Sequence, residues 1–264
     1  MVATAERAEQ PLQRRVGLWS RYTTADLDVF SDAERRRFVH GCEDPRRDEE
    51  LAWELLYRRE PRLYDRLVRA ERLHPEVVAW LPGGLERIVE VGAGAGRLTL
   101  ELLGRAQAVW AVEPAAPLRE LLLEKLSRAK RGDRARVIHG FFDELPLADH
   151  FADLVVTCSA FTPAAAHGGE RGLAEMERVC RPGGRVAIVW PNNLDWLAAR
   201  GYSHLSFGGD MFLEFASPAD AVELVEIFHP HAAAAVRELG SRRVPYAALG
   251  VNPPRDVAYK VISP

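Results

Sequence analysis

Residues 87–103 read RIVEVGAGAGRLTLELL, an apolar run that passes through alternating glycines into a helical pattern. The glycines are Gly92, Gly94 and Gly96. A glycine-rich turn from a strand into a helix lets the backbone come close to a ligand and directs free N–H groups at it. The stretch therefore predicts either a ligand-binding turn or a purely structural tight turn. If a ligand binds here, its identity decides the function.

The segment around this turn alternates between short apolar runs and helical patterns. Runs rich in β-branched residues predict strands near 85–91, 108–114, 135–140, 151–161 and 181–190. Helical patterns lie between them, over 96–106, 116–130 and 168–180. Strands that alternate with helices form right-handed βαβ units and a parallel sheet. The chain from residue 86 onward is therefore predicted to be an α/β domain with a doubly wound sheet.

The stretch before this domain has helical patterns and lacks a strand pattern. Ser31 precedes an acidic first turn, which is typical of a helix N-cap, and Pro61 stands at a favoured first helical position. We therefore expect residues 1–85 to form a helical N-terminal cap.

The C-terminal stretch differs again. A helix is predicted over 217–240, and Pro230 should kink or divide it. Two strands over 242–251 and 256–262 are joined by NPPR, a link too short for a parallel crossover, so we expect them to pair antiparallel. The predicted domain boundaries are 1–85 for the cap and 86–264 for the α/β domain, with 191–240 partly forming a lid on the acceptor side.

Three charged residues near the glycine turn bear on its ligand. The dinucleotide fingerprint is G-x-G-x-x-G, whereas the spacing here is G-x-G-x-G, and Arg97 stands where the third dinucleotide glycine would be. Glu90, just before the turn, would repel a pyrophosphate. Glu113 ends the next strand, where a carboxylate accepts hydrogen bonds from ribose hydroxyls. These features favour a nucleoside that carries an amino acid, and a nicotinamide (NAD)-dependent oxidoreductase is the less favoured alternative.

Four segments in order also resemble a known family. VEVGAGAGRLT, VWAVEP, GFFDELPLADHFADLVV and RVCRPGGRVAIVW are similar in sequence and spacing to the motifs of class I S-adenosylmethionine-dependent methyltransferases. The resemblance covers roughly residues 86–191. It implies S-adenosylmethionine as the cofactor. It also implies a Rossmann-like fold with a mostly parallel, seven-stranded sheet, and the helical N-terminal segment is then an extension of that fold.

The resemblance also implies roles for individual residues. Those expected to bind the cofactor are Glu90, Gly92, Ala93 and Gly94 around the methionine part, Glu113 and Pro114 at the ribose, and Ser159 beside the sulfonium. Many members have Gly-Asp after the third strand, with the Asp on adenine, whereas Gly140 is followed here by Phe141 and Phe142. Either Asp143 makes that contact, or backbone N–H groups and the aromatic rings hold adenine.

A catalytic residue is not required by the chemistry. Methyl transfer from a sulfonium is a direct displacement, for which alignment in a water-poor site suffices. A general base is needed only when the acceptor must lose a proton. His167, after the fourth strand, is the best candidate for a base. Other polar residues predicted at the carboxyl ends of strands are Asn192, Asn193, Asp195 and Tyr202.

The composition favours a small acceptor. The 264 residues are 47% hydrophobic and carry a formal net charge of only −3, so no global field attracts nucleic acid or an anionic membrane. No apolar run approaches the length of a membrane span, and residues 1–15 lack the apolar core of a signal peptide. We therefore expect a cytoplasmic enzyme that methylates a small molecule, and the alternative is a non-catalytic S-adenosylmethionine-binding or regulatory protein.

No metal site is expected. The three cysteines form no C-x-x-C pair, which argues against zinc and against a disulfide framework. His229 and His231 have no third ligand near them in sequence and are predicted to be a surface pair at a helix break. The oligomeric state is left open by these patterns.

Overall fold

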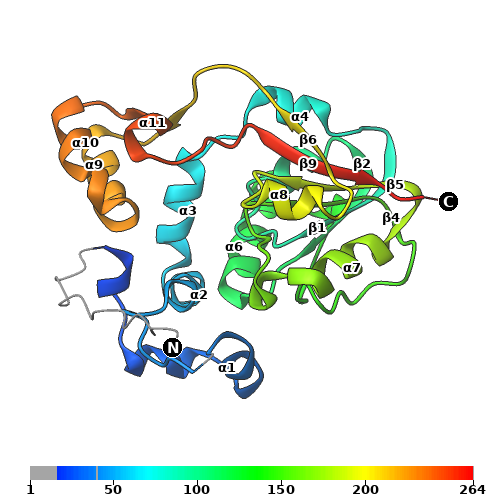
Figure 1. Ribbon diagram of the computed structural model, residues 1–264, viewed down its shortest axis with the longest axis horizontal. Coiled ribbons are helices and arrows are strands. Elements are labelled where there is room, and N and C mark those ends of the chain that lie inside the picture. Colours follow the sequence, from blue (N-terminus) through cyan, green and yellow to red (C-terminus); the bar gives the residue numbers. More distant parts are fainter. Residues whose placement is uncertain (1–16, 40, 264) are drawn as a thin grey trace, which may run out of the picture.

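The computed structural model describes residues 17–39 and 41–263, and a seven-stranded sheet forms the centre of this part (Figure 1). Five strands are parallel: β1 (Leu85–Val91), β2 (Ala106–Val112), β3 (Ala135–Ile138), β4 (Ala152–Cys158) and β5 (Cys180–Val189). The strand order is β3-β2-β1-β4-β5-β9-β6, so the winding reverses between β1 and β4. This confirms the predicted doubly wound, mostly parallel sheet. The glycine turn follows β1, at the switch point where such sheets bind ligands.

Helices cover both faces of the sheet. One face carries α4 (Pro75–Trp80), α5 (Thr99–Leu102) and α6 (Ala116–Arg128), and the other carries α7 (Gly169–Val179) and α8 (Leu194–Ala198). Within β1, Ile88 packs into the first of these two layers and its neighbour Val89 into the second. Both are fully buried, as expected for a parallel sheet covered on both sides. The 3-10 turns η3 (Gly132–Arg134) and η4 (Ala165–His167) precede β3 and α7.

The antiparallel edge of the sheet differs from the prediction. β9 (Asp256–Val261) pairs antiparallel with β5 and with β6 (Ser203–Ser206). The stretch 242–251, predicted as the partner of β9, instead forms β8 (Arg243–Pro245), which pairs with β7 (Phe212–Glu214), and the short helix α11 (Tyr246–Leu249). The predicted pairing across NPPR is wrong, because this stretch buries its apolar side chains in a separate helical cluster.

The segment before the sheet is helical, as predicted from the sequence. Its elements are η1 (Leu18–Ser20), η2 (Thr24–Val29), α1 (Asp32–Phe38), α2 (Glu49–Arg59) and α3 (Pro61–Ala70), which we call the cap helices. Ser31 is the predicted N-cap, since its hydroxyl accepts a hydrogen bond from the N–H of Glu34. Leu51 and Leu55 are fully buried in the core of this segment. The first part of the predicted cap, residues 1–16, lies outside the described residues.

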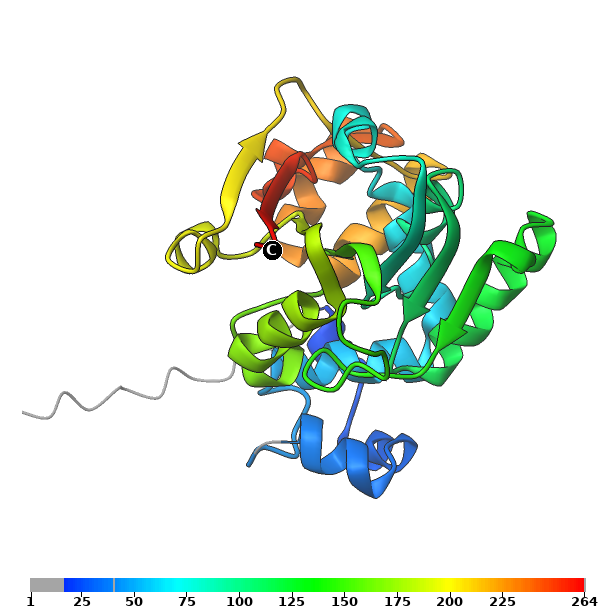
Figure 2. The same cartoon turned by 90° about the vertical axis from the view of Figure 1, so that its right-hand side faces the viewer.

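The C-terminal helices pack beside the cap. α9 (Pro218–Phe228) is separated from α10 (Ala233–Leu239) by the 3-10 turn η5 (Pro230–Ala232), so Pro230 divides the helix as predicted. These helices share an apolar cluster with Ala70 of α3. Figure 1 shows them, in orange, away from the sheet and next to α3, and Figure 2 gives the view at right angles. The helices at both ends of the chain therefore meet on one side of the sheet.

Candidate functional site

A cavity of about 730 Å³ lies between the carboxyl ends of the parallel strands and the cap helices. Its size falls within the range of about 300–1,000 Å³ that is usual for small-molecule sites. The sheet side of its wall includes Gly92, Gly94, Glu113, Ser159 and Trp190. The cap side includes Phe38, Glu50, Trp53, Glu54, Tyr57 and Tyr64.

The glycine turn borders this cavity at a point where side chains would intrude. Gly92 and Gly94 have φ angles of 72° and 54°, in the left-handed region that favours glycine. A Cβ on Gly92 would lie only 2.6 Å from the Cβ of Ala160, and one on Gly94 would lie 3.4 Å from the hydroxyl of Tyr64. The turn therefore brings bare backbone to the cavity wall.

Three N–H groups at the start of the turn are not free, contrary to the prediction. Those of Gly92 and Ala93 both donate to the carbonyl of Val112, at 2.9 and 3.0 Å. That of Gly94 donates to Glu113 Oε2 at 2.8 Å. These three hydrogen bonds hold the start of the turn against the end of β2. Gly92 and Gly94 therefore give a ligand access to the backbone because they have no side chain, and their N–H groups are already used. Ala93 itself is buried and is not among the residues that line the cavity.

Glu90 lies behind the turn. It is 1% exposed and does not line the cavity, and Thr99 Oγ1 donates to its Oε2 at 2.5 Å. Burial raises the pKa of Glu90 to about 8, although its hydrogen bonds from Thr99 oppose the shift. The carboxyl group joins the end of β1 to the start of α5 and so supports the turn. Its contact with the methionine part of a cofactor stays a prediction.

Glu113 combines burial with free acceptor capacity. Its Oε1 accepts from the N–H of Ala115 and its Oε2 from the N–H of Gly94, both at 2.8 Å. Burial raises the pKa of Glu113 to about 7, and these backbone hydrogen bonds lower it. Since a carboxylate has about four lone-pair positions, two remain for hydroxyl donors in the cavity. Pro114 also borders the cavity, and its carbonyl accepts from Arg119 at 2.7 Å.

The segment after β3 presents aromatic rings to the cavity. Phe141 and Phe142 line it, whereas Asp143 does not. Asp143 forms an ion pair with Arg37 of α1, and the Arg37 guanidinium lies 4.0 Å from the centre of the Phe141 ring. Two ways of binding adenine were predicted, and only the one that uses the aromatic rings has its side chains on the cavity wall. Asp143 instead links this segment to the cap through its ion pair with Arg37.

Two strained residues mark the carboxyl ends of β4 and β5. Ser159 and Trp190 have φ angles of 60° and 55°, which non-glycine residues rarely adopt, and both line the cavity. The N–H of Ser159 donates to the carbonyl of Val189, and that of Trp190 donates to Asp256. Such strain costs about 1–3 kcal/mol per residue and clusters at binding sites.

The candidates for catalysis separate into two groups. His167, in η4, and Asn192, after β5, both border the cavity. Residues named from the sequence that do not line it are Asn193, Asp195 and Tyr202. Asn193 instead caps α8, because its Oδ1 accepts from the N–H of Trp196 at 3.0 Å.

The charged residues on the wall, among them Arg97, Glu50 and Glu54, were missed from the sequence, whereas some aromatic residues of the cap helices were expected there. Arg97 forms an ion pair with Glu71 at 2.9 Å, and both side chains are less than 15% exposed. In the sequence, Arg97 stands out only as the residue in the place of an absent glycine. On α2, residues 50, 53, 54 and 57 all border the cavity. Their spacing of three to four residues places them on one helix face, which was the signal available in the sequence.

His229 also differs from the prediction. It is half-buried and borders the cavity, so it is not part of a surface pair. Burial lowers the pKa of His229 to about 4. Among the described residues no group of three or more His, Cys, Asp and Glu side chains could hold a metal ion. No helix in residues 17–39 or 41–263 is long and apolar enough to cross a membrane.

Comparisons with known proteins agree with this geometry. Residues 89–188 match a family described as a methyltransferase domain. An uncharacterized methyltransferase of Mycobacterium tuberculosis is 33% identical over 134 residues, which are 48% of this chain and 50% of that protein. One of Geobacillus kaustophilus is 31% identical over 102 residues, or 39% and 45% of the two chains. The chain thus spans about half the length of the curated relatives it matches.

A solved structure matches a larger share of the chain. It belongs to a Haloferax volcanii complex of the Trm112 methyltransferase activator with a methyltransferase. The TM-score is 0.50 at 16% identity, and the match covers 80% of this chain and 96% of that one. This likeness shows the fold.

Proposed function

We propose that this chain, which carries a domain of the class I S-adenosylmethionine-dependent methyltransferase family, transfers the methyl group of that cofactor to a small-molecule acceptor. One observation carries the proposal: the glycine turn, Glu113 and His167 border a single cavity. A donor site and an acceptor site must share one water-poor space for a direct displacement to occur.

The residues of the cavity suit this cofactor. Gly92 and Gly94 leave a cradle that a Cβ would fill, and Glu113 has acceptor positions left for two ribose hydroxyls. Phe141 offers an aromatic face for adenine. The glycine spacing is G-x-G-x-G, and Arg97 stands where the third glycine of the dinucleotide fingerprint would be. This opposes the alternative of an NAD-dependent oxidoreductase.

The opposite wall of the cavity supports a small acceptor. The aromatic side chains of α2, Trp53 and Tyr57, border the cavity that the glycine turn also borders, so an acceptor has to fit between the cap and the sheet. Acidic side chains, including Glu49 and Glu50, lie on the cap side. They oppose a nucleic-acid phosphate backbone, and the net charge of −3 adds to this effect.

In this proposal the protein acts mainly by position. The bound cofactor would supply an electrophilic methyl group on a sulfonium. Glu113 would hold the ribose, Phe141 would contact adenine, and Ser159 would lie beside the sulfonium. His167 would hold a proton released by the acceptor. An acceptor that fills the cavity would displace the water that competes with it for the methyl group.

A comparison of two ligands tests the proposal. S-adenosylhomocysteine should raise the melting temperature of the full chain in a concentration-dependent way, because it binds only the folded state, and NAD should leave it unchanged. Methyl-labelled S-adenosylmethionine should then pass its label to a component of a small-metabolite pool. Stabilisation by NAD alone would contradict the cofactor, and binding without transfer to any pool would favour a non-catalytic binding protein.

The affinity for S-adenosylhomocysteine is predicted to rise with pH. The ionised carboxylate of Glu113 accepts both ribose hydroxyls, and burial raises the pKa of this group to about 7 in the free protein. Affinity should therefore fall by up to about tenfold per pH unit below pH 7, measured by calorimetry from pH 5.5 to 8.5. The Glu113→Gln variant should bind more weakly with a flatter pH dependence. The same slope in this variant would assign the titration to another group.

A further inference from the structure

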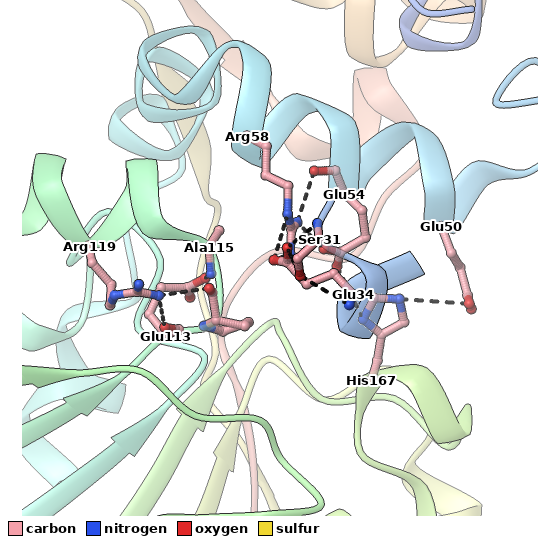
Figure 3. A network of polar contacts seen from close by, with 10 residues as sticks. Ser31, Glu34, Glu50, Glu54, Arg58, Glu113, Ala115, Arg119 and His167 are labelled. Atoms are coloured by element: carbon pink, nitrogen blue, oxygen red, sulfur yellow. Dashed lines mark hydrogen bonds and ion pairs between the residues drawn. The ribbon is translucent and has the colours of Figure 1, made fainter. Parts of the chain in front are cut away.

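His167 lies between two carboxylates that come from the cap. Its Nδ1 is 3.9 Å from Glu54 Oε1, and its Nε2 is 3.7 Å from Glu50 Oε2. Both glutamates belong to α2, on the opposite side of the cavity from the loop that carries His167 (Figure 3). At these distances the ring is within reach of both carboxylates. The Nε2 side is the more exposed one, because the Glu50 side chain is 53% exposed and that of Glu54 is 6% exposed.

Glu54 is held rigidly and away from water. Its side chain is only 6% exposed, and its Oε2 accepts from Arg58 Nη1 at 2.5 Å. Arg58 is itself 3% exposed and also pairs with Glu34, whose carboxylate caps α1 at Ser31. Burial raises the pKa of Glu54, and the Arg58 and His167 charges oppose this shift. The remaining oxygen, Oε1, is the one that faces His167.

Resting on the proposed function, we propose that Glu54 is a positioning residue for His167, and that His167 takes the proton of a neutral phenol or enol hydroxyl as that hydroxyl is methylated. A buried carboxylate opposite Nδ1 selects the tautomer with the proton on Nδ1, and it stabilises the imidazolium once the second proton arrives. Nε2 lies 3.7 Å from Glu50, but the Glu50 side chain is 53% exposed whereas that of Glu54 is 6% exposed, so Nε2 is the nitrogen that an acceptor can reach.

The walls of the cavity select the acceptor class. Phe38, Trp53 and Tyr57 line the cap side and suit a planar ring. Asp48, Glu49 and Glu50 outnumber Arg47 on the same side, so the charge there opposes an acceptor that arrives as a carboxylate. A carboxylate would also need no base, whereas a phenol with a pKa of about 10 is neutral at physiological pH and must lose its proton. A neutral hydroxyl on a planar ring satisfies all three conditions.

The step balances without another reactant. His167 Nε2 accepts the hydroxyl proton while the oxygen forms a bond to the methyl carbon. The carbon–sulfur bond breaks and its electron pair stays on sulfur, which becomes the neutral thioether of S-adenosylhomocysteine. The imidazolium afterwards returns its proton to water.

The groups around the ring come from two elements of the cap. α2 contributes Glu50 and Glu54, with Arg58 and Glu34 behind Glu54. α1 contributes the uncharged Phe38 ring, whose centre is 6.5 Å from that of His167. Of the two carboxylates near the ring, Glu54 is the buried one, so it is the one that can hold the ring in a fixed orientation.

The test compares Glu54→Gln and His167→Gln with wild type on one matched set of ring compounds, a phenol, a benzylamine and a benzoate. With methyl-labelled S-adenosylmethionine, wild type should methylate the phenol. His167→Gln should lower kcat on it by about 100-fold, the usual contribution of a general base. Glu54→Gln should lower kcat with little change in KM. The control Glu86→Gln, at a side chain that is 71% exposed on β1, should match wild type.

Two measurements separate this inference from the proposed function. S-adenosylhomocysteine should bind wild type and both variants equally, since neither residue is assigned to the cofactor. In the free protein, nitrogen NMR of His167 should show the Nδ1-protonated tautomer in wild type and a mixture in Glu54→Gln. Cofactor binding with transfer only to the amine or benzoate, or to none of the set, would overturn the acceptor class. An unchanged tautomer and an unchanged kcat in Glu54→Gln would overturn its role, whereas absent cofactor binding in wild type would overturn the proposed function itself.

Discussion

Replacing Gly94 with valine is expected to abolish detectable binding of S-adenosylhomocysteine while leaving the chain folded. Gly94 has a φ of 54°, and a side chain there would point at Tyr64, which lines the same cavity. A β-branched residue in this conformation costs about 1–2 kcal/mol in strain. It would also displace the N–H that donates to Glu113. Because a shift of about 1 Å at a site can cost about 100-fold, calorimetry should show at least that loss of affinity.

A second glycine provides the matched control. Gly104 lies in the turn after α5, with no heavy atom within 4 Å of a Cβ placed on it, and its φ is not in the left-handed region. Gly104→Ala should bind S-adenosylhomocysteine as wild type does. Circular dichroism of both variants would show that the fold persists. Full affinity in Gly94→Val would mean that the turn does not border the cofactor.

Replacing Leu154 with alanine is expected to lower the free energy of unfolding by about 2–5 kcal/mol. Leu154 lies in β4, pairs with Ile88 of β1 and is fully buried in the layer under α5 and α6. The loss has two parts, the transfer of the deleted methyl groups and the cavity that they leave in a close-packed layer. Urea unfolding followed by circular dichroism measures it through a lower midpoint at an unchanged slope.

The control for this substitution is a leucine that remains in water. Leu123 on α6 is 53% exposed, so Leu123→Ala should change the free energy of unfolding by no more than about 0.5 kcal/mol. Equal effects of the two substitutions would mean that the layer between the sheet and α6 is not the core that stabilises the chain.

The sheet and the glycine turn could be predicted because their signals are local. Strands such as β1 are short β-branched runs apolar on both faces, and the spacing of Gly92 and Gly94 needs only the chain around it. Ser31 and Pro61 likewise mark the starts of α1 and α3, and both signals depend only on neighbouring residues. The position of Glu113 followed from the strand that it ends. Each of these inferences depends on contacts within one βαβ unit or one helical turn.

The antiparallel edge of the sheet and the cap side of the cavity could not be predicted, because both depend on packing between distant segments. β9 pairs with β6 and not with 242–251, because Tyr246 and Leu249 are buried among the C-terminal helices. This burial cannot be read from any local sequence pattern. The approach of Glu54 to His167 joins the cap to the loop after β4, and it exists only because α2 packs against α6 and borders the cavity from there. Local periodicity therefore sufficed for much of the sheet side of the cavity, and the tertiary structure alone produced its cap side, since contacts between segments far apart in sequence arise from side-chain packing.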